Sequence, residues 1–176
     1  MNKLFAIFLL ITFSHQVSGQ NLSEQKIIDT STYYCRNNYL LTKAVFEKAV
    51  EIDKDFSSKP FRNDGIERIT YLLFKAKKNS RQWFHLCVYK YSNANYSAEK
   101  FKELSKVKSN NDDSVFGKGW SHSFISSDLI IKIESDCAFG ESEWNSLKGL
   151  ILRAIGKITK GKIIDTIDCY CGGGCN

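Results

Sequence analysis

A β-hairpin is predicted by three consecutive segments, IERITYLLFKA (residues 66–76), KKNSR (77–81) and QWFHLCVYKY (82–91). Both outer segments are rich in β-branched and aromatic residues, and the polar stretch between them has a length and composition typical of a hairpin loop. Side chains alternate along a strand, so Phe84, Leu86 and Val88 share one side of the second strand. We expect this aliphatic side to face the core.

The rest of the chain predicts helices and a second hairpin around the first. Apolar residues spaced by three and four indicate helices from about Tyr34 to Asp53 and from Ser142 onward, and a shorter helix is expected from Ser97 to Lys108. Residues 115–125 and 129–136 predict the second hairpin, and residues 162–168 a short strand. The order α-β-β-α-β-β-α favours an α+β fold, in which an antiparallel sheet of four to five strands packs on one face against helices.

The first nineteen residues have the features of a signal peptide. Lys3 supplies a positive start, Leu4 to Phe13 is an unbroken apolar run, and residues 17–19 are small enough for cleavage before Gln20. The run is too short to cross a bilayer, and no second run of about 18 apolar residues follows. We therefore expect a secreted or periplasmic protein without a transmembrane segment after removal of the leader. Residues 20–168 are predicted to form one domain, and residues 169–176 a cysteine- and glycine-rich tail.

All six cysteines lie beyond the leader, and three of them fall in the tail sequence CYCGGGC. In an oxidising compartment such residues are expected to form three disulfides, with a pairing that the sequence leaves open. Close thiols could instead hold Cu(I) or Zn(II), or cycle as a redox pair. Oxidised sulfur does not ligate metals and the usual zinc spacing is absent, so no metal ion or other cofactor is predicted. The disulfide candidates are Cys35, Cys87, Cys137, Cys169, Cys171 and Cys175.

An aromatic contact surface is predicted on one side of the segment 82–91. Trp83, Tyr89 and Tyr91 lie on the same side of that strand, and large rigid rings are common at partner and carbohydrate sites. The alternative is that a helix covers these rings. Alternation along the strand does not distinguish between the two arrangements.

The two histidines beyond the leader are candidates for acid–base chemistry. If the strands that carry His85 and His122 were neighbours, Glu134 or Asp136 could complete an acid–base or metal site. The simpler interpretation is a partly buried histidine with one backbone partner, because no catalytic or metal-binding spacing surrounds either residue. The sequence also lacks a Gly-x-Ser-x-Gly turn, a phosphate loop and a His-Glu-x-x-His helix.

The net charge of +6 is a modest excess and does not by itself indicate a partner. Lysines and arginine at residues 75–81 are typical of a solvated loop tip, and no nucleic-acid partner is expected. These observations favour a secreted or periplasmic, non-catalytic binding protein for an extracellular or periplasmic protein, with an inhibitor or immunity-type protein as one form of that class. The alternatives are a small secreted hydrolase that uses a His/carboxylate pair, and a metal-handling protein that uses the tail cysteines.

Overall fold

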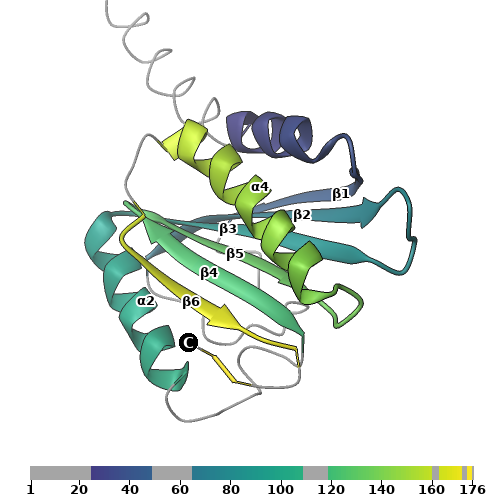
Figure 1. The fold of residues 1–176 in the computed structure, drawn as a ribbon. Coiled ribbons are helices and arrows are strands. Elements are labelled where there is room, and N and C mark those ends of the chain that lie inside the picture. The colour runs from purple at the N-terminus through teal and green to yellow at the C-terminus, as the bar shows by residue number, and fades with distance from the viewer. Residues whose placement is uncertain (1–24, 49–64, 109–118, 160–162, 172–173, 176) are drawn as a thin grey trace, which may run out of the picture.

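A computed structural model describes residues 25–48, 65–108, 119–159, 163–171 and 174–175. These residues build an antiparallel six-stranded sheet in the order β1-β2-β3-β5-β4-β6 (Figure 1). The expected sheet of four to five strands was therefore too small, although the α+β class is correct. The predicted signal peptide lies outside the described residues. The strands are β1 (Tyr39–Lys48), β2 (Ile66–Ala76), β3 (Trp83–Tyr91), β4 (Trp120–Ser126), β5 (Leu129–Ser135) and β6 (Asp165–Cys169).

Both predicted hairpins are present, the second one from Trp120 onward, because residues 115–118 of its predicted first strand lie outside the described residues. β2 pairs with β3 in the register Phe74↔Phe84, where the two rings stack with centroids 4.8 Å apart. β4 and β5 pair across a two-residue turn, in which Ser127 has a positive φ of 55°. These elements follow from local sequence, because alternating apolar residues on both sides of a short polar turn stabilise the hairpin that they form.

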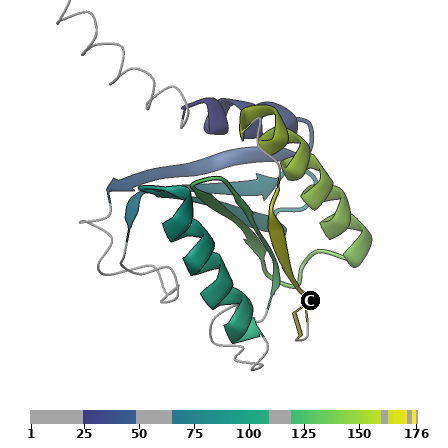
Figure 2. The same ribbon diagram turned by 90° about the vertical axis from the view of Figure 1, so that its left-hand side faces the viewer.

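Helices cover both faces of the sheet rather than one. A helix at residues 25–35 and α4 (Glu141–Thr159) pack on the first face, whereas α2 (Ala94–Lys108) packs on the second (Figures 1 and 2). None of the described helices is both long and apolar enough to cross a membrane. The expectation of one covered face was wrong because both sides of β3 are apolar and buried. Phe84, Leu86 and Val88 belong to the first core, and Cys87, Tyr89 and Tyr91 to the second.

The predicted helix from Tyr34 to Asp53 is wrong over most of its described length. The helix ends at residue 35, and residues 39–48 form the edge strand β1. A β-bulge between Leu41 and Lys43 inserts Thr42, whose hydroxyl donates a hydrogen bond to the Leu73 carbonyl at 3.1 Å. The bulge places Leu41 against the first core and Val45 against the second. The bulge therefore interrupts the alternation of side chains that identifies a strand in a sequence. The apolar residues Leu41 and Val45 are left four positions apart, a spacing that is typical of a helix.

Candidate functional site

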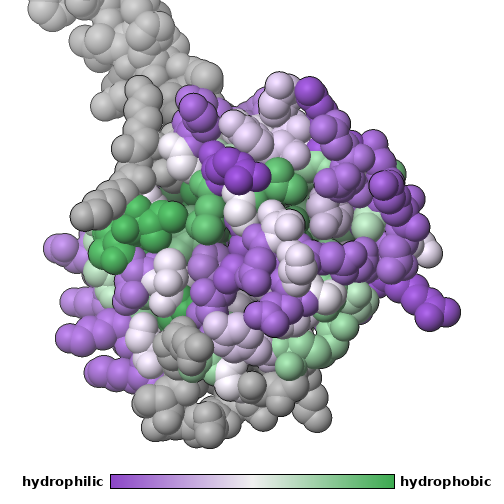
Figure 3. Space-filling model, in the orientation of Figure 1, coloured by the Kyte–Doolittle hydropathy of each residue, from purple (hydrophilic) through white to green (hydrophobic). Residues whose placement is uncertain are grey.

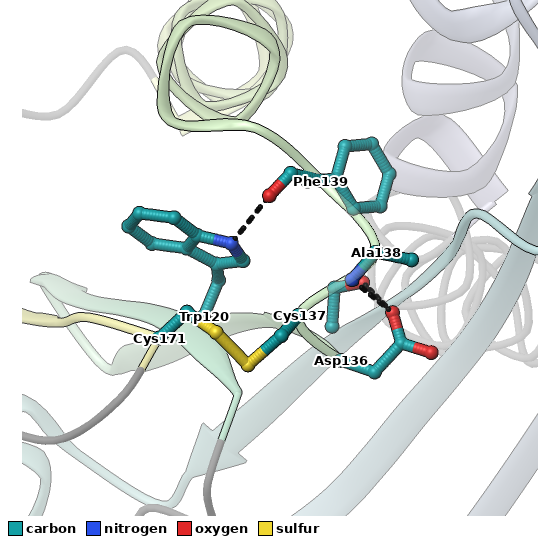
Figure 4. The surroundings of a disulfide bond; sticks show 7 residues. Trp120, Asp136, Cys137, Ala138, Phe139 and Cys171 are labelled. Atoms are coloured by element: carbon teal, nitrogen blue, oxygen red, sulfur yellow. Dashed lines mark hydrogen bonds between the residues drawn. A yellow bond between two sulfur atoms is a disulfide. The ribbon is translucent and has the colours of Figure 1, made fainter.

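Two disulfides hold the tail against the sheet. Cys137, in the turn after β5, is bonded to Cys171, and Cys169 at the end of β6 is bonded to Cys175. Figure 4 shows the first bridge beside Trp120, whose indole N–H donates a hydrogen bond to the Phe139 carbonyl at 2.9 Å. All three tail cysteines are therefore oxidised in this structure, and none supplies the thiolate that the metal-handling hypothesis requires.

The expectation of a third disulfide is wrong, because Cys35 and Cys87 are free thiols. Both are buried, but Cys35 belongs to the core on the first face of the sheet and Cys87 to the core on the second. The sheet itself separates the two sulfur atoms. Burial raises the pKa of each thiol to about 12, so neither is an activated nucleophile at neutral pH.

His85 lies in a charged cluster on the second face. Its Nδ1 is 3.5 Å from Oε1 of Glu134, and Lys132 forms an ion pair with the other oxygen of the same carboxylate. The imidazole ring is flanked by Tyr71 and Trp83, each with its ring centroid 4.6 Å away. Burial alone would raise the pKa of Glu134, but hydrogen bonds from His85 and Lys132 outweigh it and hold the value at about 2.

His122 lies in a second cluster on the opposite face. Its Nδ1 is 2.9 Å from Oδ1 of Asp168 on β6, and the Lys148 ammonium on α4 is 2.8 Å from the same oxygen. Burial would again raise the pKa of Asp168, but hydrogen bonds from His122 and Lys148 lower it to about 2. The Nε2 atom of His122 is buried and has no hydrogen-bond partner among the described residues. This imidazole is thus enclosed in the first core.

The two histidines do not form a joint site. β5 separates β3 from β4, and the rings project from opposite faces of the sheet. Of the two predicted carboxylates, Glu134 is the one that lies next to His85. Asp136 instead accepts a hydrogen bond from the backbone N–H of Ala138 at 3.0 Å (Figure 4). An open depression on α4 is lined by Glu141, Ser142, Asn145 and Ser146, and neither histidine contributes to it.

The His85 cluster does not bring a described serine hydroxyl against the imidazole. Ser121 is buried on the second face and lies opposite Glu134 in the β4–β5 pair, so the carboxylate stands between this hydroxyl and His85. A serine nucleophile has to reach the imidazole directly. Each cluster instead has the form of a buried or half-buried ion pair that neutralises the charges facing a core.

The two carboxylates predict a loss of stability in acid. A carboxyl group with a lowered folded-state pKa stabilises the protein above its unfolded value and loses that contribution as the pH falls towards 2. We expect the free energy of unfolding to drop by about 2 kcal/mol between about pH 5 and pH 2, a value reduced for partial solvent screening. Urea unfolding of the oxidised protein at successive pH values measures it.

Glu134→Gln should flatten this pH dependence, because it removes one of the two groups that must take up a proton. Glu103→Gln is the control, since the Glu103 side chain is 61% exposed on α2. A Glu134→Gln curve that runs parallel to the wild-type curve over the whole range would contradict the assignment.

Of the three predicted aromatic contact residues, only Trp83 keeps exposed surface. Tyr89 and Tyr91 are buried in the second core, together with Phe101 and Leu104 of α2. The alternative of a covering helix thus describes the two tyrosines. The indole of Trp83 is half-buried beside His85. The three rings do not form a shared contact surface.

An exposed surface with both polar and apolar side chains lies instead along β1. This ten-residue strand is at the edge of the sheet and pairs only with β2 among the described strands. Leu40 and Phe46 are 58% and 52% exposed, and their register opposite Lys75 and Thr70 places them on different faces. Between them Lys43 and Ala44 are exposed too. An edge strand of this length presents a row of outward-pointing backbone N–H and C=O groups.

A group of exposed cations surrounds the start of β1, and we call it the basic rim. Lys77 connects its parts, because its ammonium donates to the Arg36 carbonyl at 2.6 Å and its backbone N–H donates to the Asn38 carbonyl at 2.9 Å. Figure 3 shows hydrophilic side chains at the right-hand end of the molecule, where Figure 1 places the β2–β3 hairpin. No rim cation forms an ion pair with a described carboxylate. The rim comprises Arg36, Lys43, Lys75, Lys77, Lys78 and Arg81.

Sequence reasoning missed Lys132, Lys148, Asp168 and the β1 edge. Lys132 carried a usable signal, since it interrupts the apolar run LIIKI of β5 and therefore had to find a buried anion or an opening. Asp168 and Lys148 carried none, because their contact depends on the pairing of β4 with β6 and on where α4 lies.

No protein-family model, curated protein or solved structure matches this chain.

Proposed function

We propose that the chain is an exported, non-catalytic binding protein that holds an extended segment of a partner protein along β1. The observation that supports this proposal is the exposed edge of β1, with Leu40 and Phe46 projecting on either side of it. A long apolar edge strand tends to pair with another chain, and strand addition is a common mode of peptide recognition. An inhibitor or immunity-type role fits this mode, because it requires only a rigid surface.

The partner is a different protein rather than a second copy of the chain. A twofold dimer through β1 would place the same surface on both sides of the contact. The two copies of β1 would run antiparallel, so the basic rim of each copy would lie beside the Phe46 end of the other. That end carries charges of both signs, Glu67 and Arg68, and so does not complement the rim. Export is supported by the two disulfides, since such bonds persist in oxidising compartments.

A displayed library of random peptides, selected on the purified protein, tests this function. We expect selected peptides to slow hydrogen exchange at the backbone amides of β1 and to leave β6, at the opposite edge, unchanged. Phe46→Ser should weaken their binding at least roughly tenfold, as truncation of a large apolar side chain that becomes buried in an interface does. Ile164→Ser is the matched control, because Ile164 is 66% exposed directly before β6.

A library that yields no binder would overturn the proposal. So would binders that leave β1 exchange unchanged, or that bind Phe46→Ser as tightly as the wild-type protein.

A further inference from the structure

We infer that the partner segment is acidic, with its carboxylates gathered at the end that lies beside Tyr39. This inference rests on the proposed function, and it adds the chemistry of the segment. Its basis is the distribution of charge along the β1 edge.

Cations are concentrated at the Tyr39 end of the strand. Lys75 lies opposite Leu40, and Lys43 lies opposite Leu73. Both lysines therefore project on the second face of the sheet, two residue pairs apart along the β1–β2 ladder. Arg36 precedes the strand, and the hydrogen bond from Lys77 holds the hairpin loop next to it. The Arg36 guanidinium is stacked 3.8 Å from the centroid of the Tyr33 ring, which fixes its position at this end.

The Phe46 end of the strand differs in character. Ala44 and Phe46 are exposed there, and the neighbouring part of β2 carries charges of both signs, Glu67 and Arg68. A segment that matches the whole edge would therefore place carboxylates at one end and apolar side chains at the other. Opposite charges across an interface steer association and select the partner, whereas apolar contacts and backbone hydrogen bonds supply most of the affinity.

A polypeptide fits this surface better than a nucleic acid does. The cations border an edge that pairs with no second described strand, and the alternating N–H and C=O groups of such an edge match the backbone of an added polypeptide strand rather than that of a nucleic acid. Single-stranded nucleic acids need exposed rings for base stacking beside the cations. The exposed ring of Tyr33 is already stacked against Arg36, and the Trp83 ring of the hairpin is half-buried against His85.

The test uses one β1-binding peptide from the library, synthesised in versions that carry glutamate, glutamine or lysine at its charged positions. We expect the glutamate version to bind roughly tenfold more tightly than the glutamine version at low ionic strength, and the lysine version to bind most weakly. Added salt should reduce the preference for glutamate, because the rim is exposed to solvent.

The double variant Lys43→Glu/Lys75→Glu should abolish the preference for glutamate. Lys102→Glu/Lys157→Glu is the matched control, since it makes the same change in net charge at exposed positions on α2 and α4. Thermal unfolding of both variants checks that the fold is retained.

The outcomes separate the two proposals. If the glutamine version protects β1 and binds as tightly as the glutamate version, edge docking stands and the acidic segment is wrong. If neither version protects β1, both proposals fail. If a single-stranded oligothymidine binds as tightly as the glutamate version and leaves β1 exchange unchanged, the rim is a nucleic-acid site and the inference is overturned.

Discussion

Replacing Cys137 and Cys171 together by alanine is expected to lower the free energy of unfolding by about 3–4 kcal/mol. The bridge joins residues separated by 34 positions, and a cross-link over a loop of that length restricts the unfolded chain by about this amount in the chain-entropy model. The double replacement avoids leaving an unpaired thiol in the tail. Urea unfolding without reductant measures the loss, which should also lower the melting temperature by roughly 10 °C.

The second bridge supplies a matched control. Cys169 and Cys175 are separated by only 6 positions, so the same model gives a smaller cost of about 2 kcal/mol for the pair of alanines. Equal losses, or a larger loss from the short loop, would contradict the assignment. Thiol titration provides a further check, because the denatured wild-type protein should expose two thiols, Cys35 and Cys87, that do not react in the native state.

Gly119→Ala is expected to destabilise the protein by about 3–4 kcal/mol, since backbone rather than a side chain has to move. A β-carbon on Gly119 would lie 1.9 Å from the carbonyl oxygen of Ser135 and 2.9 Å from its carbonyl carbon. Gly119 immediately precedes β4, whose first residue, Trp120, pairs with Ser135. The two strands would have to separate at the end where the Trp120 indole is hydrogen-bonded to Phe139.

Gly156→Ala should instead stabilise the protein. Gly156 lies inside α4, and a β-carbon there meets nothing within 4 Å. Alanine is the better helix former, so this variant should gain about 0.5–1 kcal/mol. Thermal and urea unfolding of the two variants side by side give the comparison. A Gly119→Ala protein as stable as the wild type would show that β4 does not approach β5 in this way.

The expectations that held depend on short-range patterns. The bounds of β2 agree with the predicted strand because alternation, β-branched residues and a polar turn act within one hairpin. The helix predicted from Ser142 is α4, since Trp144, Leu147, Ile151 and Ala154 share one buried side of it. In each case the signal lies within about four residues of the residue that it places.

Only part of the candidate site could be predicted from the sequence. Sequence reasoning proposed that His85 and Glu134 could act together, and the β3–β5 register brings them opposite each other. It could not decide whether Tyr89 and Tyr91 are exposed, because the same alternation fits a bare face and one covered by α2. The basic residues of the hairpin tip are typical of a solvated loop, but their position beside an edge strand does not follow from the sequence, because the apolar spacing in β1 predicts a helix.

By itself, then, the sequence determined the two hairpins, the amphipathic helix α4 and the presence of oxidisable cysteines. The tertiary structure alone decided which cysteines pair, which strand lies at the edge, and that His122 meets Asp168 across the β4–β6 pair. The reason is the range of the interactions. Local periodicity and turn chemistry stabilise an element from within, whereas strand order and disulfide pairing depend on distant segments that bury both faces of one sheet.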